Sequence, residues 1–273
     1  MNFNQTVSHA WRKNNSLVCV GLDPDPKRFP DQFAGKNDAV FAFNRAIIDA
    51  TADLVCSFKP QIAHYAALGV EDQLLQTIQY IHQNHPDIPV ILDSKRGDIG
   101  STAEKYADEA FQRFEADAVT INPYLGFDSI EPFSRHADKG VIVLCRTSNP
   151  SSGSIQNLMV GEQKLYEKIA EMAVNDWNDN SNISLVVGAT NPEELGKIRT
   201  IVGDMMLLVP GIGAQGGDTR AAISNGQDEQ GAGLMVNSSR GVLYASRGPD
   251  FADAARQVTE QMRNEINQYR KVV

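Results

Sequence analysis

Short apolar runs alternate with helix-patterned stretches along the whole chain. Each run is a continuous block of mostly aliphatic residues rather than a strict alternation of apolar and polar positions. Continuous blocks of this length are typical of strands that are buried on both faces of a parallel sheet. The predicted strands cover residues 17–22, 54–58, 90–92, 118–121, 141–144, 185–187, 206–209 and 234–236.

A helix is predicted after each of these strands. Eight strand-then-helix units follow one another without a Pro/Gly linker or a shift in composition, which predicts a single domain over residues 1–273. Such a series closes naturally into the α/β TIM barrel, the (β/α)8 fold, and a doubly wound open sheet is the alternative. The predicted helices cover residues 37–51, 71–84, 101–113, 128–136, 161–178, 192–201, 217–225 and 250–269.

Composition narrows the class of protein. The net charge of −9 disfavours broad binding to nucleic acid or acidic membranes, although a local basic pocket can still take a small anion. No apolar run approaches the ~18 residues of a membrane span, and the first residues do not form a signal peptide. Cys19, Cys56 and Cys145 lie singly in apolar runs, which predicts reduced core thiols and a cytoplasmic protein.

Polar and charged residues follow the predicted strands. In a TIM barrel the carboxyl ends of the strands form the working face, so these side chains are expected to converge there. The residues at or just after the strand ends are Asp23, Lys59, Asp93, Lys95, Asn122, Arg146, Thr190, Pro210 and Asn237.

The densest charge lies in the segment 93–98, Asp-Ser-Lys-Arg-Gly-Asp, which we expect to form a strand-to-helix turn. Asp93 and Lys95 are two residues apart, so on an extended strand end they point the same way, and Lys59 ends the adjacent strand. Alternating charges of this kind hold one another ionised in a partly dry site. The alternative is a structural ion-pair cluster at the barrel mouth.

Two further segments indicate ligand binding. The glycine-rich stretch 211–217 follows the seventh strand and Arg240 follows the eighth, which is where barrels commonly bind phosphate. The alternative there is a plain turn followed by a surface arginine. The irregular stretch 147–160, which carries Ser148 near its start, is expected to form an active-site lid or else a tolerated surface insertion.

The five histidines are scattered without metal-ligand spacing, so no metal site is predicted. A serine nucleophile elbow and a Cys/His pair are also missing from the sequence. Acyl-enzyme chemistry therefore has no support.

The ordered motifs resemble the orotidine 5′-phosphate decarboxylase family from the first strand to the eighth. The central motif is Asp93-x-Lys95-x-x-Asp98 followed by Ile99. The segments 58–61 (Phe-Lys-Pro-Gln) and 147–150 (Thr-Ser-Asn-Pro) resemble the bacterial long branch of that family. The other matching residues, in order, are Asp23, Lys59, Pro210, Gly211, Ile212, Gly213, Gln215 and Arg240.

This resemblance implies a cofactor-free and metal-free decarboxylation of orotidine 5′-monophosphate to uridine 5′-monophosphate, the last step of de novo pyrimidine synthesis. It implies that Lys95 protonates the carbon that loses CO2, that Asp93 lies near the departing carboxylate and that Lys59 completes the charged array. Asp98, with Ile99 and Thr102, is expected to reach the active site of the neighbouring subunit in a homodimer.

The resemblance also implies the substrate contacts. Asp23 and Lys59 are expected to hold the ribose hydroxyls, Ser148 to read the pyrimidine ring, and Gln215 and Arg240 to bind the phosphate. Pro210 is expected to complete the substrate site. The chain departs from many members in having Arg96-Gly97 inside the motif and Ser239, where glycine is usual, before the phosphate arginine.

Three rival functions are weaker on the same residues. A metal-dependent lyase of the hexulose-phosphate synthase type is expected to need a glutamate where this chain has Lys59, which repels Mg²⁺. A Schiff-base aldolase needs an uncharged lysine, whereas acids flank Lys95. A non-catalytic nucleotide-binding module has no use for buried lysines.

Overall fold

The computed structural model describes residues 1–212 and 218–271. Its main sheet has eight parallel strands in the order β2-β1-β10-β9-β8-β5-β4-β3. Parallel bridges between Phe58 and Val90 and between Gln61 and Asp93 join the first strand of that order to the last. The sheet therefore closes, which confirms the predicted (β/α)8 barrel over the open sheet. The strands are β1 Val18–Leu22, β2 Ser57–Pro60, β3 Ile91–Arg96, β4 Ala118–Ile121, β5 Gly140–Arg146, β8 Ile183–Val187, β9 Leu207–Pro210 and β10 Leu234–Ser238.

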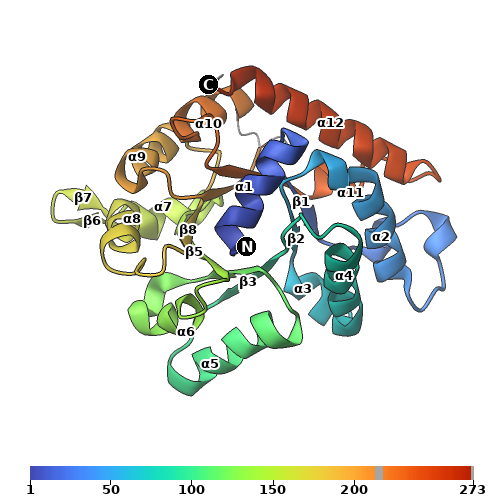
Figure 1. The fold of residues 1–273 in the computed structure, drawn as a ribbon, viewed down its shortest axis with the longest axis horizontal. Helices are drawn as coiled ribbons and strands as arrows, with labels where there is room; N and C mark the ends of the chain where they lie inside the picture. The colour runs from blue at the N-terminus through green and yellow to red at the C-terminus, as the bar shows by residue number, and fades with distance from the viewer. Residues whose placement is uncertain (213–217, 272–273) are drawn as a thin grey trace.

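Helices surround the strands (Figure 1). Each strand is followed by one main helix, as the pattern predicts, and short helices α3 (Ile62–Ala66), α7 (Gly153–Gln156) and α11 (Arg240–Leu243) lie in the connections. The main helices are α2 Ala39–Thr51, α4 Glu71–Asn84, α5 Gly100–Asp108, α6 Glu131–Ser134, α8 Leu165–Asn175, α9 Pro192–Val202, α10 Thr219–Gly226 and α12 Phe251–Tyr269.

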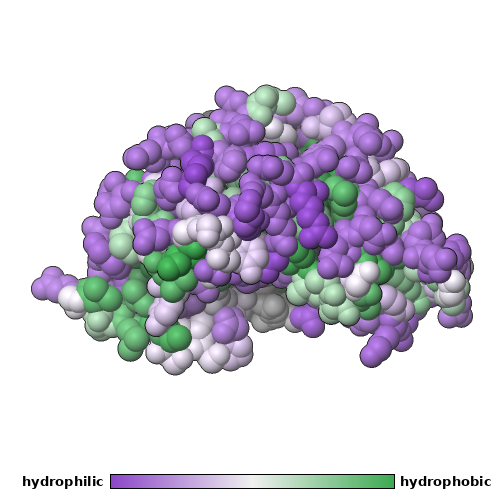
Figure 2. All heavy atoms as spheres, turned by 90° about the horizontal axis from the view of Figure 1, so that it is seen from below, coloured by the Kyte–Doolittle hydropathy of each residue, from purple (hydrophilic) through white to green (hydrophobic). Residues whose placement is uncertain are grey.

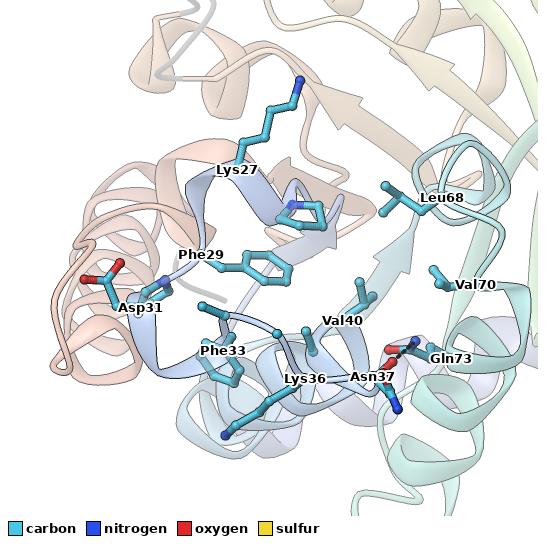
Figure 3. Close-up of a pocket in the computed structure, with 15 residues that line it drawn as sticks. Lys27, Phe29, Asp31, Phe33, Lys36, Asn37, Val40, Leu68, Val70 and Gln73 are labelled. Carbon is cyan, nitrogen blue, oxygen red and sulfur yellow. Dashed lines mark hydrogen bonds between the residues drawn. The ribbon is translucent and has the colours of Figure 1, made fainter.

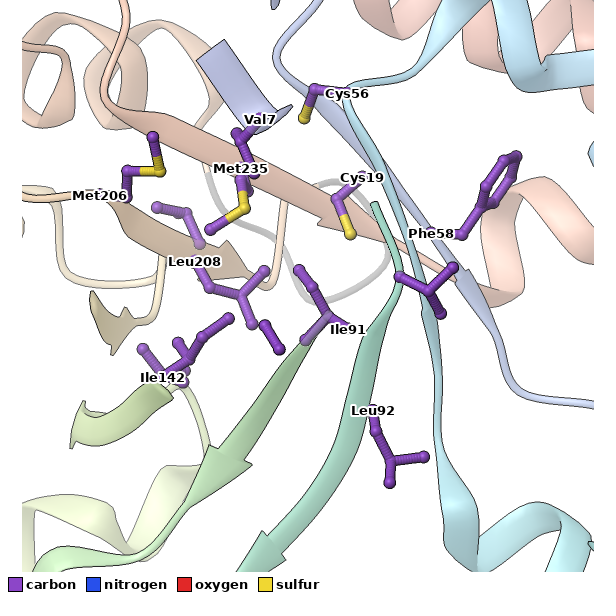
Figure 4. Packing of buried hydrophobic residues seen from close by; sticks show 14 of the residues in the cluster. Val7, Cys19, Cys56, Phe58, Ile91, Leu92, Ile142, Met206, Leu208 and Met235 are labelled. Atoms are coloured by element: carbon purple, nitrogen blue, oxygen red, sulfur yellow. The ribbon is translucent and has the colours of Figure 1, made fainter. Parts of the chain in front are cut away.

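Aliphatic and sulfur-containing side chains fill the barrel. Ile91, Ile142, Leu208 and Met235 point toward one another from four different strands (Figure 4), and all are buried. The three cysteines are free and buried, as predicted, and burial raises the pKa of the Cys19 thiol to about 11. These thiols therefore pack as small apolar groups.

The amino end of the barrel is covered by a helix that the sequence analysis does not predict. Helix α1 (Phe3–Asn14) buries Phe3, Val7 and Trp11 on one face, a spacing of four residues that is typical of an amphipathic helix. It crosses the centre of Figure 1, and Val7 lies beside the strand side chains in Figure 4. Phe3 packs on Gly140, where an added Cβ would lie 2.2 Å from the ring.

The second strand is displaced from its predicted position. Strand β2 covers Ser57–Pro60 instead of 54–58, because Ala52–Leu54 forms a 3₁₀ turn. The hydroxyl of Ser16 donates to the Leu54 carbonyl at 2.6 Å and takes the place of a strand hydrogen bond. The apolar pattern thus identifies buried residues correctly, but side-chain capping decides where the strand begins.

The third strand is longer than predicted. Strand β3 continues past the predicted residues into the charged motif as far as Arg96, so the expectation of a turn is wrong for residues 93–96. Gly97 and Asp98 do lie in the connection to α5. The Asn122 amide donates to the Arg96 carbonyl at 2.7 Å and extends the pairing with β4 to the barrel mouth. Charged residues are tolerated in this strand end because their side chains find partners there.

The helix predicted over 161–178 begins later, at Leu165. A two-stranded antiparallel hairpin, β6 (Met159–Val160) and β7 (Gln163–Lys164), precedes it. Within the described residues, every helix is too short or too polar to cross a bilayer.

Candidate active site

Three charged side chains form one hydrogen-bonded array at the carboxyl ends of β2 and β3. Lys59 Nζ lies 2.7 Å from Asp93 Oδ2, and Lys95 Nζ lies 2.6 Å from Asp93 Oδ1. The hydroxyl of Thr120, at the end of β4, donates to Asp93 Oδ1 at 2.8 Å. The structure therefore brings together the three residues that the sequence predicts as an array, and it adds Thr120.

The backbone at Lys95 is unusual. Its φ is +49°, a left-handed conformation that residues with a side chain rarely adopt, and the β3–β4 register shifts at this point. The amides of Ser94 and Lys95 both donate to the Thr120 hydroxyl at 3.0 Å, which holds the bend. Lys95 thus meets Asp93 through a strand irregularity rather than through regular alternation. Strained backbone of this kind is common at functional sites.

The array is strongly coupled by charge. Burial opposes ionisation of Asp93, but the Lys59 and Lys95 ammonium groups outweigh it and hold the pKa of Asp93 well below its usual range. Burial also opposes the charge of Lys59, yet the carboxylates of Asp93 and Asp23 raise the pKa of Lys59 above its ordinary value. Lys59 and Asp93 are therefore held as ions inside the barrel.

A pocket of about 140 Å³ opens beside this array. Asp23, Lys59, Pro210 and Arg240, four of the predicted substrate-binding residues, line it together. Asn237, at the end of β10, adds an amide side chain that the sequence analysis assigns to the working face without a role. The predicted phosphate residue Gln215 lies outside the described residues, as does Gly213.

Ser239 stands where the resemblance leads us to expect glycine. Strand β1 leaves room for its side chain. Its hydroxyl occupies the space beside Gly21, where an added Cβ would lie 1.9 Å from Ser239 Oγ. Asn237 Nδ2 also lies 3.4 Å from that hydroxyl. The serine side chain is thus packed against the barrel, and Gly21 is required to make room for it.

The stretch 147–160 is more regular than the predicted lid. It contains a 3₁₀ turn, Pro150–Ser152, followed by α7 and by the first strand of the β6–β7 hairpin. The buried Arg146 side chain donates to Gln156 Oε1 at 3.2 Å and anchors the segment. Ser148 packs closely on Gly188, which directly follows β8, so Ser148 lies near the carboxyl ends of the strands.

Asp98, Ile99 and Thr102 do not join the array of their own chain. Asp98 Oδ1 accepts a hydrogen bond from the Ile99 amide at 2.8 Å, and Ile99 is 54% exposed. Thr102 is exposed on the first turn of α5. Arg96 is also separate from the array, because its guanidinium donates to Glu109 at 2.7 Å.

A second hollow, of about 480 Å³, lies between the 26–37 segment and the α3–α4 connection (Figure 3). Phe29, Val40, Leu68 and Val70 give it an apolar wall. Gln73 Nε2 donates to the Asn37 carbonyl at 2.9 Å. Figure 3 shows the charged ends of Lys27, Asp31 and Lys36 directed away from the hollow. The hollow therefore lacks the convergent polar groups of the smaller pocket.

Thr120 and Asn237 are the site residues that sequence reasoning did not assign a role. Thr120 lies inside a predicted buried strand, where threonine is a common residue and does not by itself indicate a functional role. Its position next to the strand end, beside the charged motif of the neighbouring strand, is the signal that identifies it.

Known proteins resemble this chain over nearly its full length. A profile of the orotidine 5′-phosphate decarboxylase / HUMPS family matches residues 16–258. The chain belongs to this family. Orotidine 5′-phosphate decarboxylases from Dechloromonas aromatica (strain RCB) and Ralstonia pickettii (strain 12J) are 60% and 58% identical to it over 270 residues. Each alignment covers 99% of this chain and 100% of the relative.

Solved structures of the family share the barrel. The OMP decarboxylase of Leishmania donovani is 37% identical, with a TM-score of 0.84 over 98% of this chain and 99% of that chain. The UMP synthase of the same organism is 38% identical, with a TM-score of 0.88 over 99% of this chain and 56% of that chain. The family and the fold expected from the sequence motifs are thus confirmed.

Proposed function

We propose that this chain decarboxylates orotidine 5′-monophosphate to uridine 5′-monophosphate, without metal or cofactor, as the last step of UMP synthesis. Membership of the family supports the reaction. The single observation that supports the chemistry is the Lys59–Asp93–Lys95 array, in which a buried carboxylate holds two ammonium groups at 2.7 Å and 2.6 Å. A cytoplasmic location fits a biosynthetic enzyme and belongs to the same proposal.

Lys95 is the proposed proton donor. Loss of CO2 breaks a carbon–carbon bond and leaves its electron pair on the ring carbon. An ammonium group placed there stabilises the negative charge, gives one proton to the carbon and takes another from solvent. Lys95 suits this role because its side chain is 45% exposed toward the mouth while Asp93 fixes its position. Charges arranged beforehand need no reorganisation during the reaction.

Asp93 is proposed to face the departing carboxylate, and Lys59 to keep Asp93 ionised. Removal of one preorganised donor typically costs about 3–4 kcal/mol, whereas enzymes lower barriers by about 8–23 kcal/mol. One lysine therefore does not suffice. Binding of the remote parts of the substrate must supply the remainder.

The residues that line the pocket are proposed to contact the parts of the substrate that do not react. Asp23 and Lys59 would hold the ribose hydroxyls, Arg240 with Gln215 would bind the phosphate, and Ser148 would contact the pyrimidine. The common pocket wall of Asp23, Lys59, Pro210 and Arg240 supports this arrangement. A planar guanidinium suits phosphate oxygens because it donates in a fixed fork.

We also propose a homodimer in which Asp98, Ile99 and Thr102 complete the neighbour's site. Exposed apolar side chains near this motif support an interface, because such groups are costly to leave in water. Ile99 is 54% exposed and Tyr124, on the next strand-to-helix connection, is 82% exposed. Several apolar residues lie among polar ones in the lower half of the face in Figure 2.

Lys95→Ala tests the proposed chemistry. The protein is incubated with orotidine 5′-monophosphate and excess chelator, and loss of the orotate chromophore is followed. Wild type should turn over, and Lys95→Ala should lose at least about 10³-fold in kcat, because it lacks both the charge and the proton. Lys105→Ala, which removes an exposed lysine of α5 that pairs with Asp108 at 2.8 Å, serves as the matched control.

Two results would contradict this proposal. Absence of turnover by folded wild-type dimer would exclude the decarboxylase function for this chain. Turnover by Lys95→Ala at the wild-type rate would leave the reaction intact and remove Lys95 from its proposed role.

A further inference from the structure

The backbone on both sides of Asp23 is held by side chains from another strand-to-helix unit. The hydroxyl of Tyr65 donates to the Leu22 carbonyl at 3.1 Å. The Nδ1 atom of His64 lies 3.1 Å from the Pro24 carbonyl, which can only accept, so this nitrogen carries the proton. Asp23 is thus bracketed by two restrained neighbours.

Tyr244, at the end of α11 in the last strand-to-helix unit, supplies the remaining restraint. Its hydroxyl donates to the Asp23 carbonyl at 3.1 Å and accepts from the Asp25 amide at 2.6 Å. One hydroxyl therefore closes the turn that follows β1. No other side chain among the described residues contacts the Asp23 carbonyl through a hydrogen bond.

The carboxylate of Asp23 depends on this backbone support. Its Oδ1 atom is buried and has no hydrogen-bond partner within the described residues, although it lines the pocket beside Lys59. A carboxylate without direct side-chain hydrogen bonds is oriented by its main chain. Movement of the Asp23 backbone therefore moves the oxygen that a substrate hydroxyl would meet.

The ring of Tyr244 is itself fixed. The Arg28 guanidinium lies 3.9 Å from its centroid, and the Phe43 ring stacks on it with centroids 6.0 Å apart. The Tyr244 amide also donates to the Arg240 carbonyl at 3.3 Å, across the α11 turn. Tyr244 and the predicted phosphate arginine thus stand on one turn of helix.

We propose that Tyr244 is a positioning residue for the decarboxylation, which holds Asp23 at a fixed place relative to Arg240. The inference rests on the proposed roles of Asp23 and Arg240 in binding the substrate. Tyr244 acts through Asp23 and not by touching the reacting atoms. A substrate that contacts both Asp23 and Arg240 binds best when the distance between the turn after β1 and the α11 turn is fixed.

Tyr244→Phe removes the hydroxyl and keeps the ring. We expect kcat/KM for orotidine 5′-monophosphate to fall about 10-fold, since a misplaced binding group is costly even when folding is intact. Tyr80→Phe is the matched control, because it removes a hydroxyl that donates to Asp49 at 2.7 Å on the outer face of α4. The control should keep kcat/KM within about 2-fold.

A double-mutant cycle with Asp23→Ala separates positioning from a general structural effect. If Tyr244 acts through Asp23, Tyr244→Phe should cost less than about 2-fold in the Asp23→Ala background. An equal loss in both backgrounds, or no loss in the wild-type background, would overturn the inference. Absence of turnover by wild type would instead refute the proposed function, so the two failures are distinguishable.

Discussion

Lys59, Asp93 and Lys95 are joined by hydrogen bonds but differ in solvent exposure. This difference gives them different roles. The side chains of Lys59 and Asp93 are 6% and 9% exposed, whereas that of Lys95 is 45% exposed. A buried ion pair is stable only when its charges satisfy each other. The Lys59–Asp93 pair therefore provides a fixed charge, and Lys95 is the member that a ligand can reach.

Asp93→Asn tests the buried pair. It leaves the Lys59 ammonium without its carboxylate, so the free energy of unfolding should fall by about 3–5 kcal/mol at pH 7, as measured by urea denaturation. Asp87→Asn, which breaks an exposed pair with Lys13 at 2.7 Å, should cost only about 0–1 kcal/mol.

The difference in unfolding free energy between wild type and Asp93→Asn should depend on pH in a definite direction. The pKa of Asp93 is lowered in the folded protein, so its stabilisation is fully present above the unfolded value of about 4. It is lost as the pH falls from there through the folded pKa. The gap between wild type and Asp93→Asn should stay constant from pH 7 to pH 5 and shrink below pH 4. A gap that closes above pH 5 would contradict the assigned shift.

The observed strand boundaries differ most from the predicted ones where a side-chain hydrogen bond takes the place of a backbone bond between strands. The apolar residues predicted as strands are buried, yet β2 begins three residues late because Ser16 caps the preceding turn. Helix α1 shows the spacing Phe3, Val7, Ala10 and Trp11 and carries an Asn2/Gln5 capping box, so its signal is present in the sequence. Its place over the amino end of the barrel depends on the glycine at position 140.

The packing of β1 against the α11 turn gives a prediction at this scale. Gly21→Ala should displace Ser239, because the new Cβ would lie 1.9 Å from Ser239 Oγ. We expect kcat/KM for orotidine 5′-monophosphate to fall about 10-fold or more as the adjacent pocket distorts. Adding Ser239→Gly should restore activity to within about 3-fold of the Ser239→Gly single variant. Failure of this rescue would show that Gly21 is needed for another reason.

At the scale of the whole molecule, closure of the barrel places residues that are remote in sequence around one pocket. Asp23, Lys59 and Arg240 share a pocket although they come from the first, second and last strand-to-helix units of the chain. Asp98 accepts a hydrogen bond from the Ile99 amide and is not among the residues that line that pocket. The array of one chain therefore forms without the last acid of its own motif. The proposed dimer supplies that acid from the neighbour.

Mixed dimers test this sharing. Lys95→Ala and Asp98→Ala homodimers should both be nearly inactive. Random mixing of equal amounts should restore about one quarter of wild-type activity, because about half of the dimers are mixed and half of the sites in each mixed dimer are intact. Mixing Lys95→Ala with Lys59→Ala should restore nothing, because those two residues belong to the same chain's array. Purified mixed dimers of the first kind without activity would place Asp98 in its own subunit's site.

The sequence by itself determined the alternation of strands with main helices, the barrel, the charged motif and the place of Arg240 after the eighth strand. These features are local, because burial patterns and residue types at strand ends follow from short-range chemistry. Only the tertiary structure decided that β3 extends into the motif as far as Arg96, that Thr120 donates to Asp93 and that Tyr244 holds the Asp23 backbone. Each of those contacts joins different elements, and their geometry depends on the strand register and on the closure of the barrel, which no local pattern specifies.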